Sequence, residues 1–483
     1  GFMAVSARVG QLWQGVRRWR AGTADRPPSV NADLPESDLR RIRKLVDEII
    51  DARGGEVAAR RRARMLGVTY AEFSAIGRQR FFDVLAADYG NDPEAVDAAI
   101  DTVIHASNPN DRRTAEARLR SVLVPRRERL MRRFVGLEGG LLFLIQLRED
   151  IRDLARVDGR DGEGLQALDS ELRSILDRWF DVGLLTLTQI TWSTSAAFLE
   201  KLIEYEAVHA IRSWSDLKAR LGPGRRCYAY VHPAMPDDPL IFVEVALTDG
   251  MADAVTPLIE ASDGPPRTDV DRRSAADSES DYDTAIFYSI SNCHEGLAGV
   301  SLGDFLIKSV VEELTRELPG LRRFATLSPL PGFRRWLRSE LDSDRPVLIE
   351  SETEKLSELG LSPVREQLAD LVSGPMPPID DARLDAAKPV FMRLAAEYIV
   401  NQRRSSGRAL DPVTHFHLSN GARAERLNWL ANPTDVGWER GMAMMVNYRY
   451  ELRNIESNHD RYVSDGVVNA SEDITKLLAG GDG

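Results

Sequence analysis

The stretch from residue 287 to residue 336 limits what this chain can fold into more than any other part of the sequence. Alternating strand-forming residues over 286–291 predict a strand, and closely spaced glycines follow it at 296, 299 and 303. Apolar residues at helical spacing over 306–314 predict a helix, and a second strand is predicted over 324–328. A strand that leads through a glycine-rich turn to a helix N-terminus is a common anion site, because free N–H groups and the helix dipole favour negative charge there.

Composition places the chain among ordinary globular proteins and argues against several classes of partner. Its 483 residues suffice for two or three domains, and 43% hydrophobic with 29% charged residues is typical of such proteins. The net charge of −12 argues against nucleic acid as the main partner. Cys227 and Cys293 are the only cysteines, so we expect neither a disulfide framework nor a Cys-based zinc site. No apolar run approaches the roughly 20 residues that span a bilayer, so no membrane partner is expected.

The chain divides into two parts of different pattern. From residue 36 to residue 184 the pattern is helical almost throughout, whereas strand and helix signals mix from 185 onward. Strands are predicted at 185–190, 227–231, 240–247, 413–418, 426–430 and 442–450, a helical run at 196–221, and an exposed loop at 261–283. We therefore predict an α+β protein: an N-terminal segment and linker (1–35), an all-helical domain (36–184) and an α/β domain with a mixed sheet and flanking helices (185–483).

Two histidines fall in the predicted strand at 413–418. Alternation along a strand would place His415 and His417 on one face, with Phe416 and Leu418 on the other. Two histidines on one face suggest a metal site, but Asp411 is the only acid nearby, so we expect no zinc there. From the residues alone, a histidine in this position is more often a structural one.

Other candidate residues also have structural interpretations when the residues are taken alone. The glycine loop at 299–303 matches neither the Walker loop nor the dinucleotide fingerprint. Ser328 lies where a strand ends before a proline, a usual place for a turn-forming serine, and it is not in a G-x-S-x-G context. Tyr448 and Tyr450 share one strand face, which fits aromatic packing.

Three separated blocks, in this order, resemble the malonyl-CoA decarboxylase family. They are the block at 287–336, Phe-His-Leu-Ser-Asn-Gly-Ala-Arg-Ala-Glu-Arg-Leu-Asn-Trp at 416–429, and Met-Val-Asn-Tyr-Arg-Tyr at 445–450. The resemblance continues more weakly over most of the chain. It implies a helical oligomerisation domain that forms a homodimer or homotetramer, followed by a catalytic domain of the GNAT acyltransferase fold, which binds CoA pyrophosphate on a glycine-rich loop. It also implies malonyl-CoA as substrate and no cofactor, since CoA is part of the substrate.

The resemblance assigns roles to particular residues. Ser328 and His417 match the catalytic serine and histidine of the family, and Tyr450 and Ser289 match hydrogen-bonding residues of its pocket. The CoA loop is carried over onto Ala298, Gly299, Val300, Ser301, Leu302, Gly303 and Asp304. Family members carry a glutamate directly before Leu302-Gly303, where this chain has Ser301, so any role of that acid is in doubt here. Asp304 either replaces it or is simply a helix-start aspartate.

The chemistry implied by the family sets requirements that these residues meet. Decarboxylation of malonyl-CoA sends the electrons of the breaking C–C bond into the thioester carbonyl, so the enzyme must stabilise an oxyanion and then protonate carbon. We expect Ser328 and His417 to do this. Neutral donors such as Ser289 and Tyr450 should hold the carboxylate, because a strong arginine clamp would stabilise the ground state.

Two other functions stay open at this point. One is an acyl-CoA N-acetyltransferase on the same fold, and the other is a non-catalytic CoA-binding oligomer. The C-terminus lacks the Ser-Lys-Leu peroxisomal address that eukaryotic members of the family often carry, so we expect a bacterial, cytoplasmic protein.

Overall fold

The computed structural model describes residues 19, 28–158, 162–206, 208–260, 281–303, 306–343 and 345–479. Most of the predicted N-terminal segment (1–35) and of the predicted loop (261–283) therefore lies outside the described residues, as does Asp304. The chain forms two compact units. The first comprises residues 1–185, 232–236 and 294–301, and the second comprises 186–231, 237–293 and 302–483.

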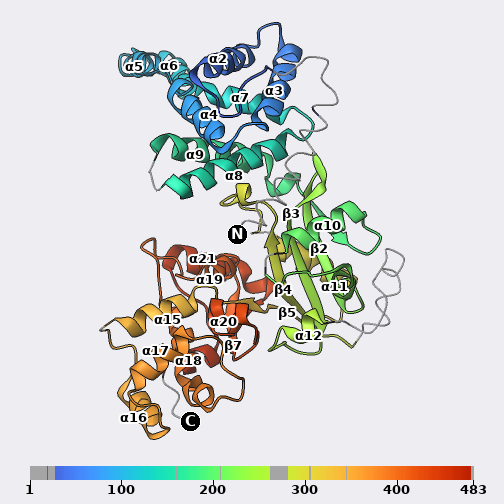
Figure 1. Ribbon diagram of the computed structural model, residues 1–483, viewed down its shortest axis with the longest axis vertical. Helices are drawn as coiled ribbons and strands as arrows, with labels where there is room; N and C mark the ends of the chain where they lie inside the picture. The colour runs from blue at the N-terminus through green and yellow to red at the C-terminus, as the bar shows by residue number, and fades with distance from the viewer. Residues whose placement is uncertain are drawn as a thin grey trace. The chain divides into compact units, whose positions relative to one another are not determined.

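The first unit is built mainly of helices, drawn in blue to green in Figure 1. They are α2 (Glu36–Ile50), α3 (Glu56–Tyr70), α4 (Ala75–Asp88), α5 (Pro93–Ile104), α6 (Pro109–Val122), α7 (Arg126–Val135), α8 (Gly140–Asp158) and α9 (Glu163–Trp179), followed by the 3₁₀ turn η1 (Val182–Leu184). Aromatic rings form the centre of this unit: the ring centroid of Tyr70 lies 5.4 Å from that of Phe81 and 5.8 Å from that of Phe143.

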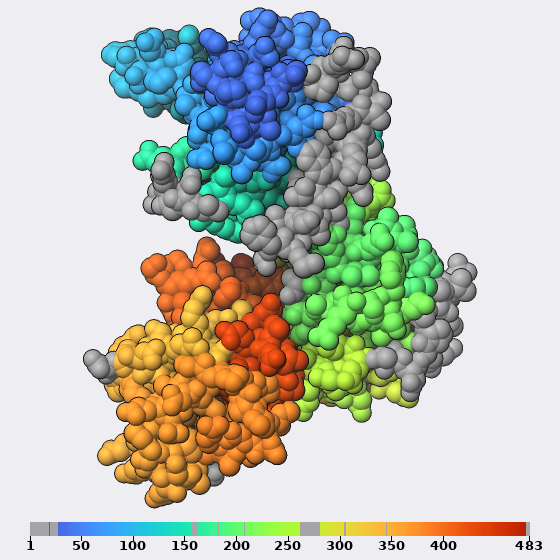
Figure 2. Space-filling view, viewed as in Figure 1, coloured from blue at the N-terminus to red at the C-terminus, as the bar shows by residue number. Residues whose placement is uncertain are grey.

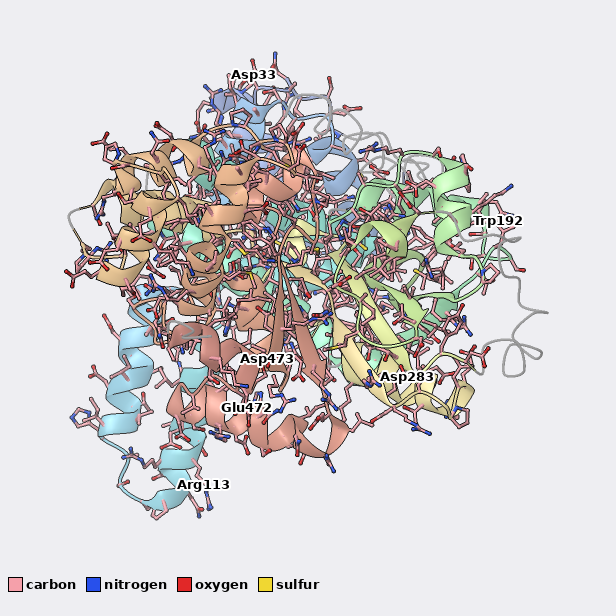
Figure 3. The ribbon with its side chains drawn as sticks, turned by 90° about the horizontal axis from the view of Figure 1, so that it is seen from below. Asp33, Arg113, Trp192, Asp283, Glu472 and Asp473 are labelled. Carbon is pink, nitrogen blue, oxygen red and sulfur yellow. The ribbon has the colours of Figure 1, made fainter. Side chains whose placement is uncertain are left out.

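Helices α5 and α6 form a hairpin whose ends are set by capping residues. Asp92 and Asn108 accept hydrogen bonds from the backbone N–H groups that begin α5 and α6, and a proline follows each cap. Ala99 and Ala115 are the buried residues of these two helices among those described. The hairpin accordingly extends from the rest of its unit in the ribbon and space-filling views, and Figure 3 shows Arg113 near its far end.

The second unit is organised by one eight-stranded mixed sheet. Its strands are β1 (Thr186–Ile190), β2 (Arg225–His232), β3 (Met235–Thr248), β4 (Thr284–Asn292), β5 (Arg323–Thr326), β6 (Ser328–Pro329), β7 (Arg423–Asn428) and β8 (Met445–Tyr450). The order is β1-β2-β3-β4-β5-β8-β6, and β7 also pairs with β8. Strands β4 and β5 are parallel, whereas β8 runs antiparallel to β5, β6 and β7.

Helices surround this sheet. They are α10 (Ala196–Tyr205), α11 (Trp214–Arg220), α12 (Thr256–Ile259), α14 (Leu306–Glu317), α15 (Phe333–Asp342), α16 (Glu350–Glu358), α17 (Val364–Ser373), α18 (Ala382–Val400), α19 (Pro412–Ser419), α20 (Asp435–Gly441), α21 (Ile455–Asp465) and α22 (Glu472–Leu478), with the 3₁₀ turn η4 (Leu452–Asn454) before α21. Phe198 of α10 and Leu217 of α11 pack on Cys227 and Phe242 of the sheet. An N-terminal helical part followed by a mixed sheet with flanking helices confirms the predicted α+β class.

The parallel pairing of β4 with β5 is short and does not extend along the C-terminal half of β4. The two strands pair from Thr284 and Arg323 to Phe287 and Thr326. One further bond joins the N–H of Leu327 to the carbonyl of Phe287 at 3.0 Å. Beyond that point β4 continues beside β3, while β6 pairs with β8. The C-terminal half of β4 therefore has no strand partner on its β6 side among the described residues.

Three predictions about local structure are corrected here. The predicted strand at 413–418 is helix α19. The helical run at 196–221 is two helices, α10 and α11, separated at 206–213. Strand β3 begins at Met235 and so contains Pro236 and Pro239, which had been placed in a connection. These prolines are tolerated because β3 pairs with β4 only from Ile241 onward, so no ladder bond to β4 is required of them.

Among the described residues, no helix combines the length and the apolar character that crossing a membrane requires.

Candidate active site

Ser328 and His417 lie 89 positions apart in the chain and meet inside the second unit. Ser328 Oγ lies 2.9 Å from Nε2 of His417. Ser328 belongs to the short strand β6 and His417 to helix α19, and both side chains are buried. The two residues therefore form one hydroxyl–imidazole pair.

The pair extends into a longer hydrogen-bonded chain. The hydroxyl of Tyr450 lies 2.8 Å from Nδ1 of His417, and Ser328 donates its proton to the hydroxyl oxygen of Thr326 at 2.9 Å. Because Ser328 gives its proton to Thr326, His417 must donate from Nε2 to Ser328, which leaves Nδ1 to accept from Tyr450. We call these four residues (Tyr450, His417, Ser328 and Thr326) the imidazole chain.

The imidazole chain carries no charge. Burial lowers the pKa of His417 to about 3 and raises the pKa of Tyr450, and burial is the sole cause of both shifts. Tyr448 stacks on the imidazole with its ring centroid 4.5 Å away, and its hydroxyl lies 2.7 Å from that of Thr414. His417 is thus a neutral imidazole, held by an aromatic face and two hydrogen bonds.

Asp411 explains how the sequence places His417. One carboxylate oxygen accepts the backbone N–H groups of Val413 and Thr414 at 2.9 Å, and Pro412 is the first residue of α19. The other oxygen accepts the N–H of Gly332, just after β6, at 3.3 Å. Burial raises the pKa of Asp411. This aspartate therefore connects the helix that carries His417 to the turn that follows Ser328.

The helical conformation of 412–419 overturns the predicted arrangement of the two histidines. Residues two apart in a helix point about 200° from each other, because each residue turns the helix by about 100°. His415 accordingly faces Tyr462, with Nδ1 2.8 Å from the phenol oxygen, and not Ser328. Among the residues that the structure describes, no group of three or more His, Cys, Asp or Glu side chains is arranged to hold a metal ion.

Ser289 lies on β4 and its hydroxyl is engaged by a carboxylate. It lies 2.8 Å from both oxygens of Glu206, and Ser291 donates to the same carboxylate at 3.1 Å. The structure thus gives Ser289 an acidic partner, whereas Tyr450 hydrogen-bonds His417. The predicted role of Ser289 in the substrate pocket stays a prediction.

The glycine loop is held by a buried arginine within the first unit. It begins with the 3₁₀ turn η3 (Glu295–Leu297), and one nitrogen of Arg148 donates to the carbonyls of Gly296 and Ala298 at 2.7 and 2.9 Å. Gly299 has a φ of +81°, a conformation that glycine adopts without strain. This turn is therefore a fixed feature that needs glycine at position 299.

The end of the glycine loop is in contact with the helix of His417. Leu302 and Gly303 belong to the second unit, and a Cβ placed on Gly303 would lie 2.6 Å from the ring of Phe416, the residue before His417. Glycine is needed there because of this close approach. Ala298, Val300 and Ser301 lie in the first unit, and Asp304 lies outside the described residues, so the CoA-binding role of the loop stays a prediction.

Sequence reasoning missed several residues that position the pair. Thr326, which accepts from Ser328, could have been found because it lies two residues earlier in the same predicted strand and so on the same face. Asp411 and Pro412 form a helix-start signal that would have predicted α19. The stacking of Tyr448 on His417 has no local signal in the sequence.

Fold and site together define a class. The chain is an α+β protein with a buried, uncharged hydroxyl–imidazole–phenol chain, an arrangement suited to enzymes that polarise a carbonyl group. The family model of the malonyl-CoA decarboxylase C-terminal domain matches residues 183–482, and that of the N-terminal domain matches residues 89–180. The chain belongs to the malonyl-CoA decarboxylase family.

Individual relatives agree with this assignment. The chain is 36% identical over 412 residues to the mitochondrial malonyl-CoA decarboxylase of Anser anser anser, covering 83% of this chain and 80% of the relative. For the enzyme of Rattus norvegicus the identity is 34% over 459 residues, covering 94% and 89%. The crystal structure of malonyl-CoA decarboxylase from Rhodopseudomonas palustris is 37% identical, with a TM-score of 0.78, and covers 93% of this chain and 100% of that one. The structure from Agrobacterium vitis is 35% identical, with a TM-score of 0.77, covering 91% and 99%.

Proposed function

We propose that this carboxy-lyase converts malonyl-CoA to acetyl-CoA and CO2, with Ser328 and His417 acting on the thioester. The observation that carries the proposal is the imidazole chain, in which the hydroxyl of Ser328 lies 2.9 Å from a neutral His417. Family membership supports the reaction, and the geometry supports the roles of the two residues.

The first step breaks the C–C bond to the carboxylate. CO2 leaves, and the bonding electron pair moves into the thioester to give an enolate. Ser328 turns its O–H from Thr326 to the enolate oxygen, and the N–H of His417 keeps the serine oxygen polarised. Both are neutral donors, so they gain most when negative charge develops on the substrate oxygen, which lowers the barrier more than it tightens ground-state binding.

The second step gives the enolate carbon one proton, so that acetyl-CoA is formed. We assign its delivery to the His417–Ser328 pair, with Tyr450 returning a proton to Nδ1 from its hydroxyl 2.8 Å away. A solvent proton restores Tyr450, which balances the reaction: malonyl thioester and one proton give acetyl thioester and CO2. No step calls for a redox or metal cofactor, and we propose that CoA is the only cofactor-like group, as part of the substrate.

CoA itself is proposed to bind at residues 298–304. The positive φ of Gly299 and the Arg148 bonds to the preceding carbonyls support a preformed turn. Assembly into a homodimer or homotetramer through residues 36–184, and a location in the bacterial cytoplasm, stay predictions.

The experiment that tests the proposal uses the purified chain and malonyl-CoA alone. Acetyl-CoA and CO2 should appear in equal amounts without an acceptor. Formation of an N-acetylated amine only after an acceptor and acetyl-CoA are added, with malonyl-CoA left intact, would favour an acetyltransferase. CoA binding without either product would favour a non-catalytic role.

A further inference from the structure

Strand β8 loses one pair of backbone hydrogen bonds where its partner changes from β5 to β6. Residues 449–450 of β8 pair with β5, and residues 445–446 pair with β6, which begins at Ser328. Both pairings have the same register, and that register places Thr326 opposite Tyr448. The backbone N–H of Tyr448 donates instead to the side-chain oxygen of Thr326, at 3.2 Å. The ladder is therefore interrupted at this pair without a change of register.

Asn447 binds the backbone carbonyl that the interruption leaves open. Its amide nitrogen donates to the carbonyl of Thr326 at 2.9 Å and to that of Ala252 at 3.0 Å. Its amide oxygen accepts from Arg426 at 3.1 Å and from Asn428 at 2.9 Å. Asn447 is fully buried, and these four bonds use both of its donors and both lone pairs of its oxygen. The interruption before Ser328 is therefore held in place from both sides.

The hydroxyl of Thr326 is thereby fixed as an acceptor for Ser328. A hydroxyl oxygen has two lone pairs. One accepts the N–H of Tyr448, and the other accepts the proton of Ser328 at 2.9 Å. Thr326 is fully buried. In an ordinary ladder the N–H of Tyr448 would bond the carbonyl of Thr326 and would not hold its hydroxyl.

The direction of donation along the imidazole chain depends on this acceptor. With Ser328 donating to Thr326, three bonds form, since Tyr450 donates to Nδ1 of His417 and Nε2 donates to Ser328. In the reverse direction Ser328 donates to Nε2 and Nδ1 donates to Tyr450, so the proton of Tyr450 has no acceptor within the imidazole chain. A buried hydroxyl without an acceptor is unfavourable, so the first direction should exceed the second by about ten-fold or more in population.

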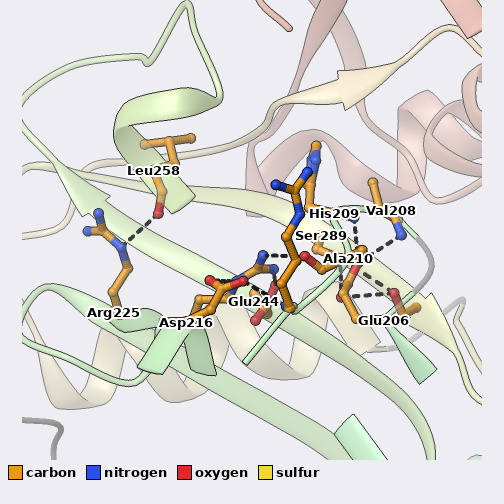
Figure 4. Close-up of polar contacts among 12 residues, drawn as sticks. Glu206, Val208, His209, Ala210, Asp216, Arg225, Glu244, Leu258 and Ser289 are labelled. Atoms are coloured by element: carbon orange, nitrogen blue, oxygen red, sulfur yellow. Dashed lines mark hydrogen bonds and ion pairs between the residues drawn. The ribbon is translucent and has the colours of Figure 1, made fainter. Parts of the chain in front are cut away.

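The acceptor is also uncharged, which distinguishes Ser328 from another buried serine. Figure 4 shows Ser289, whose hydroxyl lies 2.8 Å from both oxygens of the Glu206 carboxylate. Hydrogen bonds to a charged group are roughly twice as strong as those between neutral groups. The hydroxyl of Thr326 therefore orients the Ser328 proton but competes only weakly with an oxyanion for it.

We propose that Thr326 is a positioning residue of the reaction: its hydroxyl fixes the direction of donation along the imidazole chain, and with it the tautomer of His417 that carries its proton on Nε2. The kinetic consequence rests on the proposed function, because a His417 in the other tautomer cannot donate to the oxygen of Ser328. Thr326 acts through Ser328 and need not touch the substrate.

The tautomer of His417 can be measured without turnover. In the chain labelled with nitrogen-15 histidine, long-range nitrogen–proton correlation spectra report which ring nitrogen carries the proton, and the signal missing from His417→Gln identifies this ring. The parent should carry the proton on Nε2 alone. In Thr326→Val either direction leaves one hydroxyl without an acceptor, so the two tautomers should be populated within about ten-fold of each other. Thr326→Ser keeps the oxygen and should restore Nε2–H.

Steady-state kinetics with malonyl-CoA give the second readout. Thr326→Val should lower kcat by about 3- to 10-fold, in line with the smaller fraction of competent tautomer, and leave KM within about two-fold. Thr326→Ser should keep kcat within about two-fold of the parent value. Thr284→Val removes the hydroxyl of another fully buried strand residue and is the matched control, which should alter neither the tautomer nor kcat.

Three results would overturn the proposal. They are a proton on Nδ1 of the parent, which needs no variant to fold, an unchanged tautomer in Thr326→Val, and an equal kcat loss in Thr326→Val and Thr326→Ser. A threonine that only supports the sheet would lower stability and leave the tautomer as it is. Absence of acetyl-CoA from the parent incubated with malonyl-CoA would count against the proposed function instead, and the spectra would still decide whether Thr326 sets the tautomer.

Discussion

Two clusters of buried polar side chains in the second unit differ in charge: one is uncharged, and the other contains an ion pair. The imidazole chain contains no charged side chain, and burial alone sets the pKa shifts of His417 and Tyr450. The other group, which we call the β4 cluster, consists of Glu206, Ser289, Ser291, Glu244 and Arg220, and includes an ion pair of 3.0 Å whose two side chains are 2–3% exposed. Neutral hydrogen-bond donors stabilise negative charge that develops only in the transition state. A buried ion pair instead fixes the local structure, and removing one partner lowers the stability of the fold. The predictions that follow test this division.

The largest effect should come from the imidazole chain. Ser328→Ala removes the hydroxyl that faces the thioester oxygen in our mechanism, and should lower kcat by about 10²–10⁴-fold. The free energy of unfolding should fall by only about 1–3 kcal/mol, because Nε2 of His417 loses its partner while Nδ1 keeps its bond to Tyr450. Steady-state kinetics with malonyl-CoA, together with a melting curve, check both parts. A large loss of stability would place Ser328 with the β4 cluster instead.

Arg220→Met should lower the stability of the fold strongly and kcat only slightly. Above about pH 8, where Glu244 is ionised, it leaves the carboxylate of Glu244 buried without its partner, and should lower the free energy of unfolding by about 3–5 kcal/mol. Denaturant unfolding measures this loss, and the kcat of the folded fraction should stay within about three-fold of the parent value. A kcat loss as large as that of Ser328→Ala would show that the charged cluster takes part in the chemistry.

Gly303→Ala tests whether close packing fixes the position of His417. The new Cβ would lie 2.6 Å from the ring of Phe416, so that ring, or α19 which carries it, must shift. We expect kcat to fall by about 10- to 100-fold, because small displacements of catalytic groups are costly. Gly90→Ala is the control, since its Cβ would make an ordinary contact of 3.6 Å with Arg127. Equal kcat values for the two variants would contradict this role.

The two groups should also give stability opposite dependences on pH, which is the smallest effect. Burial and the neighbouring Glu206 raise the pKa of Glu244 from 4.5 to about 8, so the folded state binds its proton more tightly, and stability falls as pH rises between these values. The pKa of His417 is lowered from 6.5 to about 3, so stability falls as pH drops between these values.

Two single variants separate these two pH dependences of stability. Glu244→Gln should flatten the dependence between pH 4.5 and 8, and His417→Gln should flatten the limb below pH 6.5; urea unfolding at several pH values measures both. If either variant removed both pH dependences of stability, the protonation of Glu244 and that of His417 would be coupled.

The sequence allowed the fold class and the Ser328–His417 pair to be predicted, but for different reasons. Periodicity was sufficient for the helical first part and for the strand, loop and helix around residues 284–317. The pairing of two residues so far apart followed from the resemblance of the blocks around them, since no local pattern connects them. Periodicity misassigned 413–418, because a short run with alternating polarity fits strand or helix, and the cap at Asp411 decides between them.

Other features depend on tertiary contacts that no local pattern encodes. Glu206 lies at the end of α10, where an acid is ordinarily exposed, and only the folded chain brings it to Ser289.

The most direct test of the account is a paired measurement on His417→Ala: turnover of malonyl-CoA, and the dissociation constant of acetyl-CoA. A neutral imidazole that acts on the developing enolate predicts that kcat falls by about 10²–10⁴-fold while acetyl-CoA binds within about three-fold of the parent affinity. Equal loss of turnover and of acetyl-CoA binding would show that His417 only supports the fold, and would contradict the account.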